Sequence, residues 1–428
     1  MVPFYLRLRR KLTPEVEVLG KVNLHELALE GLSVSSLGGQ TLNSYDQTRT
    51  PGGSSGGTGA AIAANFAVFG TGTDTVNSLR SPASANSLFS FRPTRGLISR
   101  AGVIPVSFTQ DTIGAIARNP KDLAVALTVM ASVGVDPADN VTASIPPELI
   151  GKDYSEGLSE GTLKGLRLGI IDGFFNYTAG PETDPVNTIM ASMISLLESA
   201  GVTIVNITEP IYNSTALSRT LDVQTFEYRE QLSAYLASLG AAGPHQRSFA
   251  ELYDPPVRDF LVIPSQYGYI AAAATGSTGD GAYAARRQGI RDLTAALEAT
   301  LARHALDALA YPEQNNLVVP VGATTQAGRN GLLAALAGFP VVNVPAGFSA
   351  PTPAAPAGVP VGMELLGRPW TEARLLNLAH HVAALAPVRR MPPFANASVE
   401  VKHYETVPVV KPERANIPAA YPVGVLGP

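Results

Sequence analysis

The amino-acid sequence predicts an α/β fold, with a mixed and mostly parallel β-sheet covered by helices. The first observation is a strand–helix–strand rhythm, in which Leu166–Ile171 and Val202–Val205 read as strands that flank a helix at Val186–Ala200. Such units are typical of sheets with helical crossovers. The second is composition: 45% of the 428 residues are apolar and 15% are charged, which suits a large core. No linker divides the chain, so we expect one domain over residues 1–428.

The first hundred residues contain two glycine-rich stretches around an apolar segment. Residues 15–30 predict a short strand followed by the start of a helix, and residues 36–58 predict a long polar loop. Gly59–Phe69 is alanine-rich and apolar nearly all round, which is typical of a fully buried helix. Residues 70–84 are again rich in Gly, Ser and Thr, with a short helix expected after Ser81.

The rest of the chain alternates helices and strands, as a helix-covered sheet requires. Residues 215–304 are expected to be mostly helical, with a glycine-rich break near 275–281, and the proline-rich tail from Pro387 is expected to wrap the surface. The other expected elements are a helix at Leu123–Val133, strands at Leu306–Tyr311 and Val341–Val344, and a closing helix at Arg374–Ala386.

Charge and residue content exclude several classes of function. The net charge is −4 and no broad basic stripe is present, so nucleic acid is not an expected partner. The absence of cysteine excludes disulfides, thiolate zinc sites and a cysteine nucleophile. The histidines have no metal-like spacing with carboxylates, so we expect neither a metal nor a cofactor, and His245, His380 and His381 are expected on the surface or in packing.

The compartment stays unknown from the sequence. No segment offers the ~20 apolar residues of a membrane span, so a soluble protein is expected. The first residues lack the apolar region of a signal peptide, which favours the cytoplasm for the chain as it stands. Sequons of the N-x-[ST] type lean weakly toward a secretory origin if further residues precede the chain; they occur at Asn140, Asn176, Asn206, Asn213 and Asn396.

Two short polar segments bracket the apolar helix and carry the chemistry. They are PGGSSGGTG at 51–59 and GTGTDTVNSLRSPAS at 70–84. Together they bring backbone N–H groups and hydroxyls close to one another, and glycine allows the backbone to approach a ligand. Such an arrangement suits the stabilisation of a developing oxyanion.

These segments resemble the signature of the amidase signature family. Other parts of the chain resemble that family in the same order: LGKVNLHELA (19–28), SFTQDTIGAIAR (107–118), PVVNVPAGF (340–348) and PVGMELLGRPWTEARLL (360–376). The resemblance spans about residues 15–390. The segment FEYREQLSAYLASL at 226–239 resembles the branch that acts on peptide amides and on small aliphatic or aryl amides.

The resemblance implies a catalytic triad of serine, cis-serine and lysine. Ser78 matches the nucleophile, and Ser54, which lies 24 positions earlier, matches the cis-serine. A neutral lysine would take a proton through Ser54, and Ser78 would attack the carbonyl carbon of a small-molecule or peptide amide and form an acyl-enzyme. The backbone N–H groups of Thr75, Val76, Asn77 and Ser78 would then form the oxyanion hole.

Neighbouring residues are assigned supporting roles. We expect Ser55, Asp74 and Arg80 to hold the catalytic segments in place rather than to react. Gln110, Asp111 and Thr112 fit a pocket wall and a structural turn equally well. Tyr228 and Tyr235 could face a substrate funnel, but core packing is the preferred interpretation.

Two positions depart from the family pattern. The family lysine lies well upstream of the GKVN element, whereas Lys11 and Lys21 are the only lysines before Ser54, and Lys21 matches a different family lysine. We therefore expect the catalytic lysine and its N-terminal strands to be missing, as in a truncated chain. Val76 and Asn77 also replace two glycines, and a Cβ atom restricts positive φ.

Other interpretations stay open. GGSSGG alone could be a flexible linker, and Gly52-x-Ser54-x-Gly56 matches the nucleophile elbow of α/β-hydrolases, although no apolar strand precedes it. As to function, the alternatives are a catalytically inactive amidase-like protein and the A-type component of an amidotransferase, which delivers ammonia to a charged tRNA. A homodimer also stays open.

Overall fold

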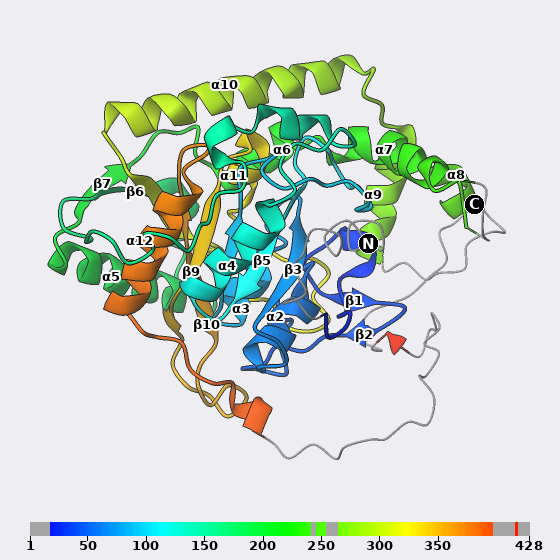
Figure 1. Ribbon diagram of the computed structural model, residues 1–428. Coiled ribbons are helices and arrows are strands. Elements are labelled where there is room, and N and C mark those ends of the chain that lie inside the picture. Colours follow the sequence, from blue (N-terminus) through cyan, green and yellow to red (C-terminus); the bar gives the residue numbers. More distant parts are fainter. Residues whose placement is uncertain (1–17, 241–244, 254–263, 397–415, 418–428) are drawn as a thin grey trace.

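The computed structural model describes residues 18–240, 245–253, 264–396 and 416–417. An eight-stranded sheet runs through the molecule in the order β3-β5-β4-β9-β10-β8-β6-β7 (Figure 1). Its strands are β3 (Phe69–Asp74), β4 (Phe89–Arg92), β5 (Thr112–Ala117), β6 (Arg167–Ile171), β7 (Thr203–Ile207), β8 (Ala308–Pro312), β9 (Val341–Phe348) and β10 (Pro360–Leu366). A two-stranded sheet of β1 (Val34–Ser35) and β2 (Gly39–Gln40) lies near the N-terminal end of the described chain.

Helices surround the sheet. They are α2 (Gly56–Ala63), α3 (Arg80–Ala85), α4 (Pro120–Ala131), α5 (Asp184–Ser199), α6 (Ser214–Leu221), α7 (Gln224–Ser238), α8 (Phe249–Tyr253), α9 (Pro264–Thr275), α10 (Gly281–Arg303), α11 (Leu332–Ala337) and α12 (Glu372–Leu385). Short 3-10 turns lie at Glu26–Ala28, Asn140–Ser144, Pro147–Leu149, Asp172–Phe174 and Pro393–Asn396. None of the helices in the described ranges is long and apolar enough to cross a membrane.

The expected α/β fold with a mixed, helix-covered sheet is confirmed, but parallel pairs are fewer than expected. Of the pairings within the eight-stranded sheet as described, β6–β7 and β6–β8 are parallel and the other five are antiparallel. The physical reason lies in how the strands are connected. A parallel pair needs a long crossover such as α5 between β6 and β7, whereas a loop without a helix joins β9 to β10 and lets the chain turn back.

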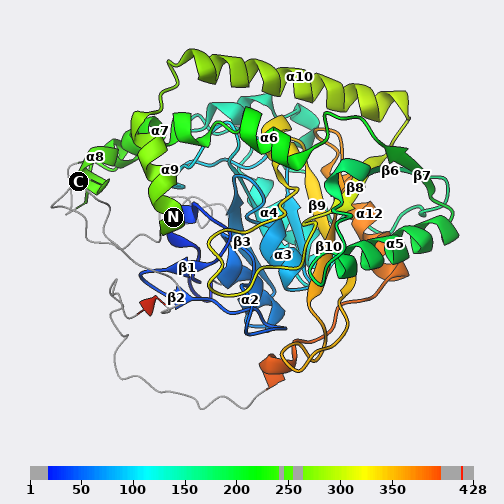
Figure 2. The same ribbon diagram turned by 180° about the vertical axis from the view of Figure 1, so that it is seen from behind.

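Alternating side chains bury both faces of the sheet. In β8, Ala308 and Ala310 join a core formed with α4, α5 and α12, while Leu309 and Tyr311 point the other way into a core formed with α6, α10 and α11. Beyond that second core, α2 and α3 cover the β4–β5 end of the same face, where Ile116 packs on Leu79. Figure 2 shows the long α10 crossing one end of the sheet.

Two local predictions for the first hundred residues are corrected. The described part of the strand expected within 15–30 has no strand structure, because no described strand pairs with it. The helix expected at Gly59–Phe69 ends at Ala63, since Asn65 has a φ of 65° and Phe66 is 74% exposed. The segment after it contains β3, for which no strand was predicted, and its ladder with β5 pairs Gly72 with Gly114.

The prediction for the fold concerns Gly114. A Cβ atom there would lie 2.0 Å from the carbonyl oxygen of Phe91 and 2.7 Å from Leu79 Cδ1, and the backbone cannot yield without breaking the ladder. We expect Gly114→Ala to lower the free energy of unfolding by about 1–3 kcal/mol or more, measured by urea denaturation. Gly281→Ala, at the start of α10 with nothing within 4 Å, is the matched control and should leave stability unchanged or slightly higher. Equal effects of the two changes would contradict this packing.

Candidate active site

The fold brings Ser54 and Ser78 together from two loops. Ser54 precedes α2 and Ser78 precedes α3, and the two loops meet where the Ser55 N–H donates to the Ser78 carbonyl oxygen at 3.2 Å. Ser54 is fully buried and Ser78 is 8% exposed. Within the described chain, the Ser54 hydroxyl has no hydrogen-bond partner, and it makes no hydrogen bond to the Ser78 side chain.

The turn that carries Ser54 is held by its neighbours. The Gly53–Ser54 peptide bond is cis. The Ser33 hydroxyl donates to the Gly52 carbonyl oxygen at 2.7 Å and accepts from the Gly56 N–H at 3.0 Å, which fixes both ends of the turn. Gly52 has a φ of 70°, and a Cβ atom there would lie 2.7 Å from the Ser81 carbonyl oxygen, so only glycine fits.

Ser55 links α2 to β3. Its hydroxyl lies 3.4 Å from the Thr73 carbonyl oxygen and 3.3 Å from the Thr73 nitrogen, and Thr58, one turn later, donates to the Thr71 carbonyl oxygen at 2.9 Å. These side chains bond the outer edge of β3, which is an end strand of the sheet. These bonds fit the supporting role predicted for Ser55. Its contribution to activity stays a prediction.

Arg80 is fully buried beneath the Ser78 loop. It donates to both carboxylate oxygens of Asp74 at 3.1 Å and to those of Glu364 at 2.8 and 2.9 Å. It also donates to the carbonyl oxygens of Val76 and Gly331. Burial alone would lower the pKa of Arg80, but Asp74 and Glu364 raise it above its usual range. Arg80 thus stays charged and ties the loop to β10.

Asp74 also forms an ion pair with a second arginine. Arg92 on β4, also fully buried, donates to Asp74 Oδ1 at 2.7 Å, and the Leu79 N–H donates to Asp74 Oδ2 at 3.0 Å. Burial would raise the pKa of Asp74, but Arg80 and Arg92 hold it below its usual range. Asp74 is therefore ionised, fully bonded and unsuited to proton transfer, which agrees with a structural role.

Val76 and Asn77 fit the loop without the backbone conformation reserved for glycine. Neither has a positive φ. Asn77 is fully buried and donates to Glu313 Oε1 at 2.7 Å. A Cβ atom on residue 331 would lie only 2.4 Å from the Asn77 Cβ, and residue 331 is a glycine. Val76 packs against the core around α10 and α11. The side chain of Asn77 thus has room because residue 331 is a glycine.

The backbone N–H groups of Val76, Asn77 and Ser78 face no protein acceptor in the described structure. Thr75, at the start of the same loop, is held by its side chain, because its hydroxyl donates to Asp111 Oδ1 at 2.6 Å. Its carbonyl oxygen accepts from the Gln110 side chain at 3.2 Å. The loop therefore has three successive backbone donors that no protein group uses in the described structure.

Several neighbours of the site are not evident from the sequence. Glu313 and Glu364 are fully buried, and burial together with the Glu364 charge raises the pKa of Glu313 well above its usual range. His25 is fully buried with both ring nitrogens unpartnered in the described chain, and its backbone N–H donates to the Ser54 carbonyl oxygen at 3.0 Å. Burial lowers the pKa of His25 to about 4, so its ring is neutral near pH 7.

The described lysines do not contact either serine. Lys21 is exposed, and none of Lys21, Lys121, Lys152 and Lys164 makes a hydrogen bond to Ser54 or Ser78. Lys11 lies outside the described residues. In the described ranges, no group of three or more His, Asp or Glu side chains could hold a metal ion.

Asp111 and the two tyrosines make contacts that bear on the interpretations left open by the sequence. Asp111 both lines a hollow and fixes a turn, since its carboxylate accepts from the Val106 and Ser107 N–H groups at 2.9 Å. Tyr228 is buried, with its hydroxyl 2.7 Å from that of Tyr253, so it belongs to the core. Tyr235 is half-buried and bonds the Gly102 carbonyl oxygen at 3.4 Å.

The first prediction from the site is that Arg80→Lys destabilises the fold strongly. A lysine supplies three donors without the planar fork, so at least one of Asp74 and Glu364 loses its partner in a buried place. We expect a loss of about 3–5 kcal/mol in the free energy of unfolding, measured by urea denaturation. Arg291→Lys, on the exposed face of α10, is the control and should change stability by less than about 0.5 kcal/mol. A similar small change at Arg80 would disprove the role assigned to it.

The second prediction is a pH-dependent stability difference for Glu313→Gln. Because the folded-state pKa of Glu313 is raised, the folded protein keeps a proton that the unfolded chain releases near pH 4.5. The free energy of unfolding of the wild type therefore falls by about 1.4 kcal/mol for each pH unit above that value. Glutamine does not titrate, so Glu313→Gln removes this loss. Relative to wild type, Glu313→Gln should gain stability as pH rises from 5.5 to 7.5 in urea denaturation. The exposed Glu298→Gln is the control, and a pH-independent difference at 313 would refute the assignment.

Comparison with known proteins agrees with the geometry. Residues 15–376 match the Amidase family model. The A-type component of the glutamyl-tRNA(Gln) amidotransferase of Acinetobacter baumannii is 34% identical over 382 residues, which cover 85% of this chain and 72% of that protein. The peptide amidase of Stenotrophomonas maltophilia superposes with a TM-score of 0.75 at 31% identity, covering 91% of this chain and 78% of that one. A bacterial aryl acylamidase shares the fold, with a TM-score of 0.73 at 18% identity over 92% of this chain and 78% of its own. This chain belongs to the amidase family.

Proposed function

We propose that this chain hydrolyses carboxamides, with Ser78 as the nucleophile and Ser54 as its proton relay. The observation that carries the proposal is the meeting of three features in one place. They are the nearly buried Ser78, the unpartnered hydroxyl of Ser54, and the unbonded N–H groups of Val76, Asn77 and Ser78. A nucleophile, a relay and oxyanion donors are the parts that acyl transfer requires.

The proposed reaction has two steps. Ser78 Oγ attacks the carbonyl carbon while its proton passes to Ser54 and the Ser54 hydroxyl proton passes on to a base, and the oxyanion is held by the N–H groups of the loop. The C–N bond then breaks, the amine or ammonia leaves with the proton that the base returns through Ser54, and Ser78 carries the acyl group. In the second step water attacks the ester; one of its protons returns to Ser78 Oγ and the product leaves as the carboxylic acid.

The proposed proton relay needs a base that accepts the proton from Ser54. This need supports the alternative of a catalytically inactive amidase-like protein. A buried lysine can accept a proton when its surroundings lower its pKa, and the resemblance assigns this role to a lysine. No described lysine contacts Ser54. A chain that keeps the family fold without turnover is therefore a second candidate, and the labelling experiment below separates the two.

A third candidate is a component of an amidotransferase. The curated relatives bear that name, and the identity of 34% over 382 residues favours it. The 31% identity to a peptide amidase over 91% of the chain, and the absence of a broad basic stripe, support hydrolysis of free amides instead. Release of ammonia from simple carboxamides by the isolated chain supports the amidase, whereas release from glutamine alone favours the amidotransferase.

Covalent labelling tests the proposed nucleophile. A fluorophosphonate should add once to the purified chain, as seen by intact mass, and the adduct should be absent in Ser78→Ala. Labelling of Ser54→Ala should be at least about 100-fold slower, because the proton of Ser78 loses its path. Ser199→Ala, an exposed serine on α5, is the control and should label like wild type. A folded wild type that takes no label would instead favour the inactive amidase-like protein.

A further inference from the structure

Hydrogen bonds to two carbonyl groups direct the N–H groups of the loop before Ser78. The Val76 carbonyl oxygen accepts from the Arg80 side chain. The Asn77 carbonyl oxygen accepts from the N–H groups of Arg80 and Ser81 at 2.9 and 2.8 Å. In a planar trans peptide the N–H points opposite to the C=O. The N–H groups of residues 77 and 78, which share peptide groups with these two carbonyls, therefore both point away from Arg80.

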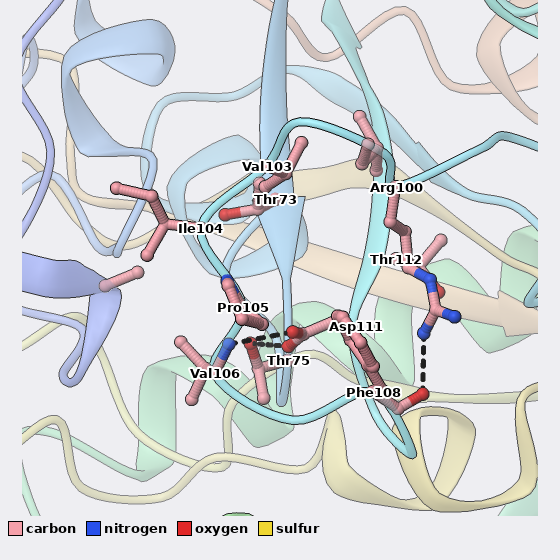
Figure 3. A pocket seen from close by; sticks show the side chains of 12 residues that line it. Thr73, Thr75, Arg100, Val103, Ile104, Pro105, Val106, Phe108, Asp111 and Thr112 are labelled. Carbon is pink, nitrogen blue, oxygen red and sulfur yellow. Dashed lines mark hydrogen bonds between the residues drawn. The ribbon is translucent and has the colours of Figure 1, made fainter. Parts of the chain in front are cut away.

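Two side chains of the loop are held by carboxyl groups on separate segments. Figure 3 shows Asp111 next to Thr75, whose hydroxyl donates to Asp111 Oδ1 at 2.6 Å. Asn77 is fully buried, and its Nδ2 donates to Glu313 Oε1 at 2.7 Å. The loop thus has one carboxyl support at its start and another at the residue directly before Ser78.

Glu313 is itself fixed in the fold. It directly follows β8, and its N–H donates to the Gly362 carbonyl oxygen in β10 at 3.1 Å. Its own carbonyl oxygen accepts from the Asn330 N–H at 3.1 Å. The Asn330 side chain donates in turn to the carbonyl oxygens of Phe174 and Pro312 at 2.8 Å. Glu313 is therefore anchored on both sides of its main chain and can hold residue 77 in place.

Asn77 and Glu313 each keep one side-chain oxygen without a partner. Asn77 Oδ1 and Glu313 Oε2 are buried, and neither makes a hydrogen bond within the described chain. An amide oxygen and a carboxylate oxygen are both acceptors and cannot satisfy each other. A protonated carboxyl group carries one O–H donor, so it can donate from Oε2 to Oδ1 while Oε1 accepts from Nδ2. The planar acid and amide groups then share two hydrogen bonds, and both buried oxygens gain a partner.

The groups that face Glu313 favour its neutral form. Glu364 on β10 and Asp74 at the end of β3 are carboxylates, Tyr311 lies on β8, and α11 has no titratable side chain. Arg80 from α3 is the cation that faces Glu313, and it already donates to both carboxylates. Burial first, and the charge of Glu364 next, hold the pKa of Glu313 well above its usual range.

We propose that Glu313 is a positioning residue, whose neutral carboxyl group pairs with the Asn77 side chain through two hydrogen bonds and so fixes the backbone N–H groups of residues 77 and 78. The inference rests on the proposed amide hydrolysis, in which these N–H groups hold the oxyanion. A glycine at 77 has no side chain to pair, so this support belongs to the asparagine. A carboxylate at 313 has no proton to donate to Asn77 Oδ1, so the pair opens when Glu313 ionises.

Glu313→Leu and Glu313→Gln test the positioning role. Leucine fills a similar volume but cannot bond Asn77, whereas the amide of glutamine can make both hydrogen bonds. For hydrolysis of acetamide we expect kcat to fall about 10- to 100-fold in Glu313→Leu, with KM within about 3-fold of wild type, and glutamine to restore most of the loss. The rate at which a fluorophosphonate labels Ser78 should change in parallel.

Glu372→Leu is the matched control. Glu372 is also fully buried, and its Oε2 also has no partner in the described chain, but it lies on α12 and bonds Thr94. Its replacement should cost stability and leave kcat unchanged. The pH profile separates positioning from a structural role: kcat of the wild type should fall at alkaline pH, as Glu313 loses its proton, and Glu313→Gln should lack this fall. The same alkaline fall in both proteins, or equal kcat values for the leucine and glutamine variants, overturns the proposal.

Infrared spectroscopy tests the pair without turnover. The wild-type spectrum minus that of Glu313→Gln should contain the C=O stretch of a carboxylic acid at pH 7, and Asn77→Ala should shift this band. No such band overturns the proposal, as does a band that shifts in Asn330→Ala but not in Asn77→Ala, because Asn330 Oδ1 is another buried oxygen that has no partner in the described ranges. If the wild type hydrolyses no amide and takes no label while the band shifts in Asn77→Ala, the proposed function fails and the pairing of Glu313 with Asn77 stands.

Discussion

The pairing of Arg80 with Asp74 and Glu364 is the constraint on which the site depends. A guanidinium that is fully removed from water must find a partner for each N–H group, and Arg80 finds them on three separate segments. Asp74 ends β3, Glu364 lies in β10, and Gly331 precedes α11. Ser78 stands two residues before Arg80, so this network fixes the position of Ser78 relative to the sheet. The network also explains why this loop can be polar and yet buried.

Burial decides the state of the remaining carboxyl group. Arg80 and Arg92 face Asp74, and Arg80 also faces Glu364. Burial first, and the charge of Glu364 next, raise the pKa of Glu313 well above its usual range. Glu313 Oε1 accepts from the side chain of Asn77, the residue directly before Ser78. Asn77 thereby gains a role that glycine could not fill, and Gly331 leaves the space that its side chain needs.

The sequence predicts the two glycine- and serine-rich segments better than the elements around them. Ser54 and Ser78 stand in two separate short motifs, and the structure brings these motifs together at the bond from the Ser55 N–H to the Ser78 carbonyl oxygen. The strand β3 is not evident, because GTGTD has the composition of a loop; its glycines are required by contacts, since a Cβ on Gly72 would lie 2.6 Å from the Ser55 hydroxyl. Glu313 and Glu364 could not be predicted either. Their partners Asn77 and Arg80 are more than 230 positions away, and nothing local to either glutamate marks it as buried.

Asp111 joins the loop before Ser78 to a neighbouring turn. One of its oxygens accepts from the Thr75 side chain, and the other accepts from the backbone N–H groups of Val106 and Ser107. The loop and the turn are therefore held by one carboxylate rather than by separate supports. Burial raises the pKa of Asp111 to about 6, against the effect of its three donors, so acid converts an oxygen that accepts into one that donates. The position of the loop and that of the turn consequently depend on the same proton, and both segments should loosen together below about pH 6.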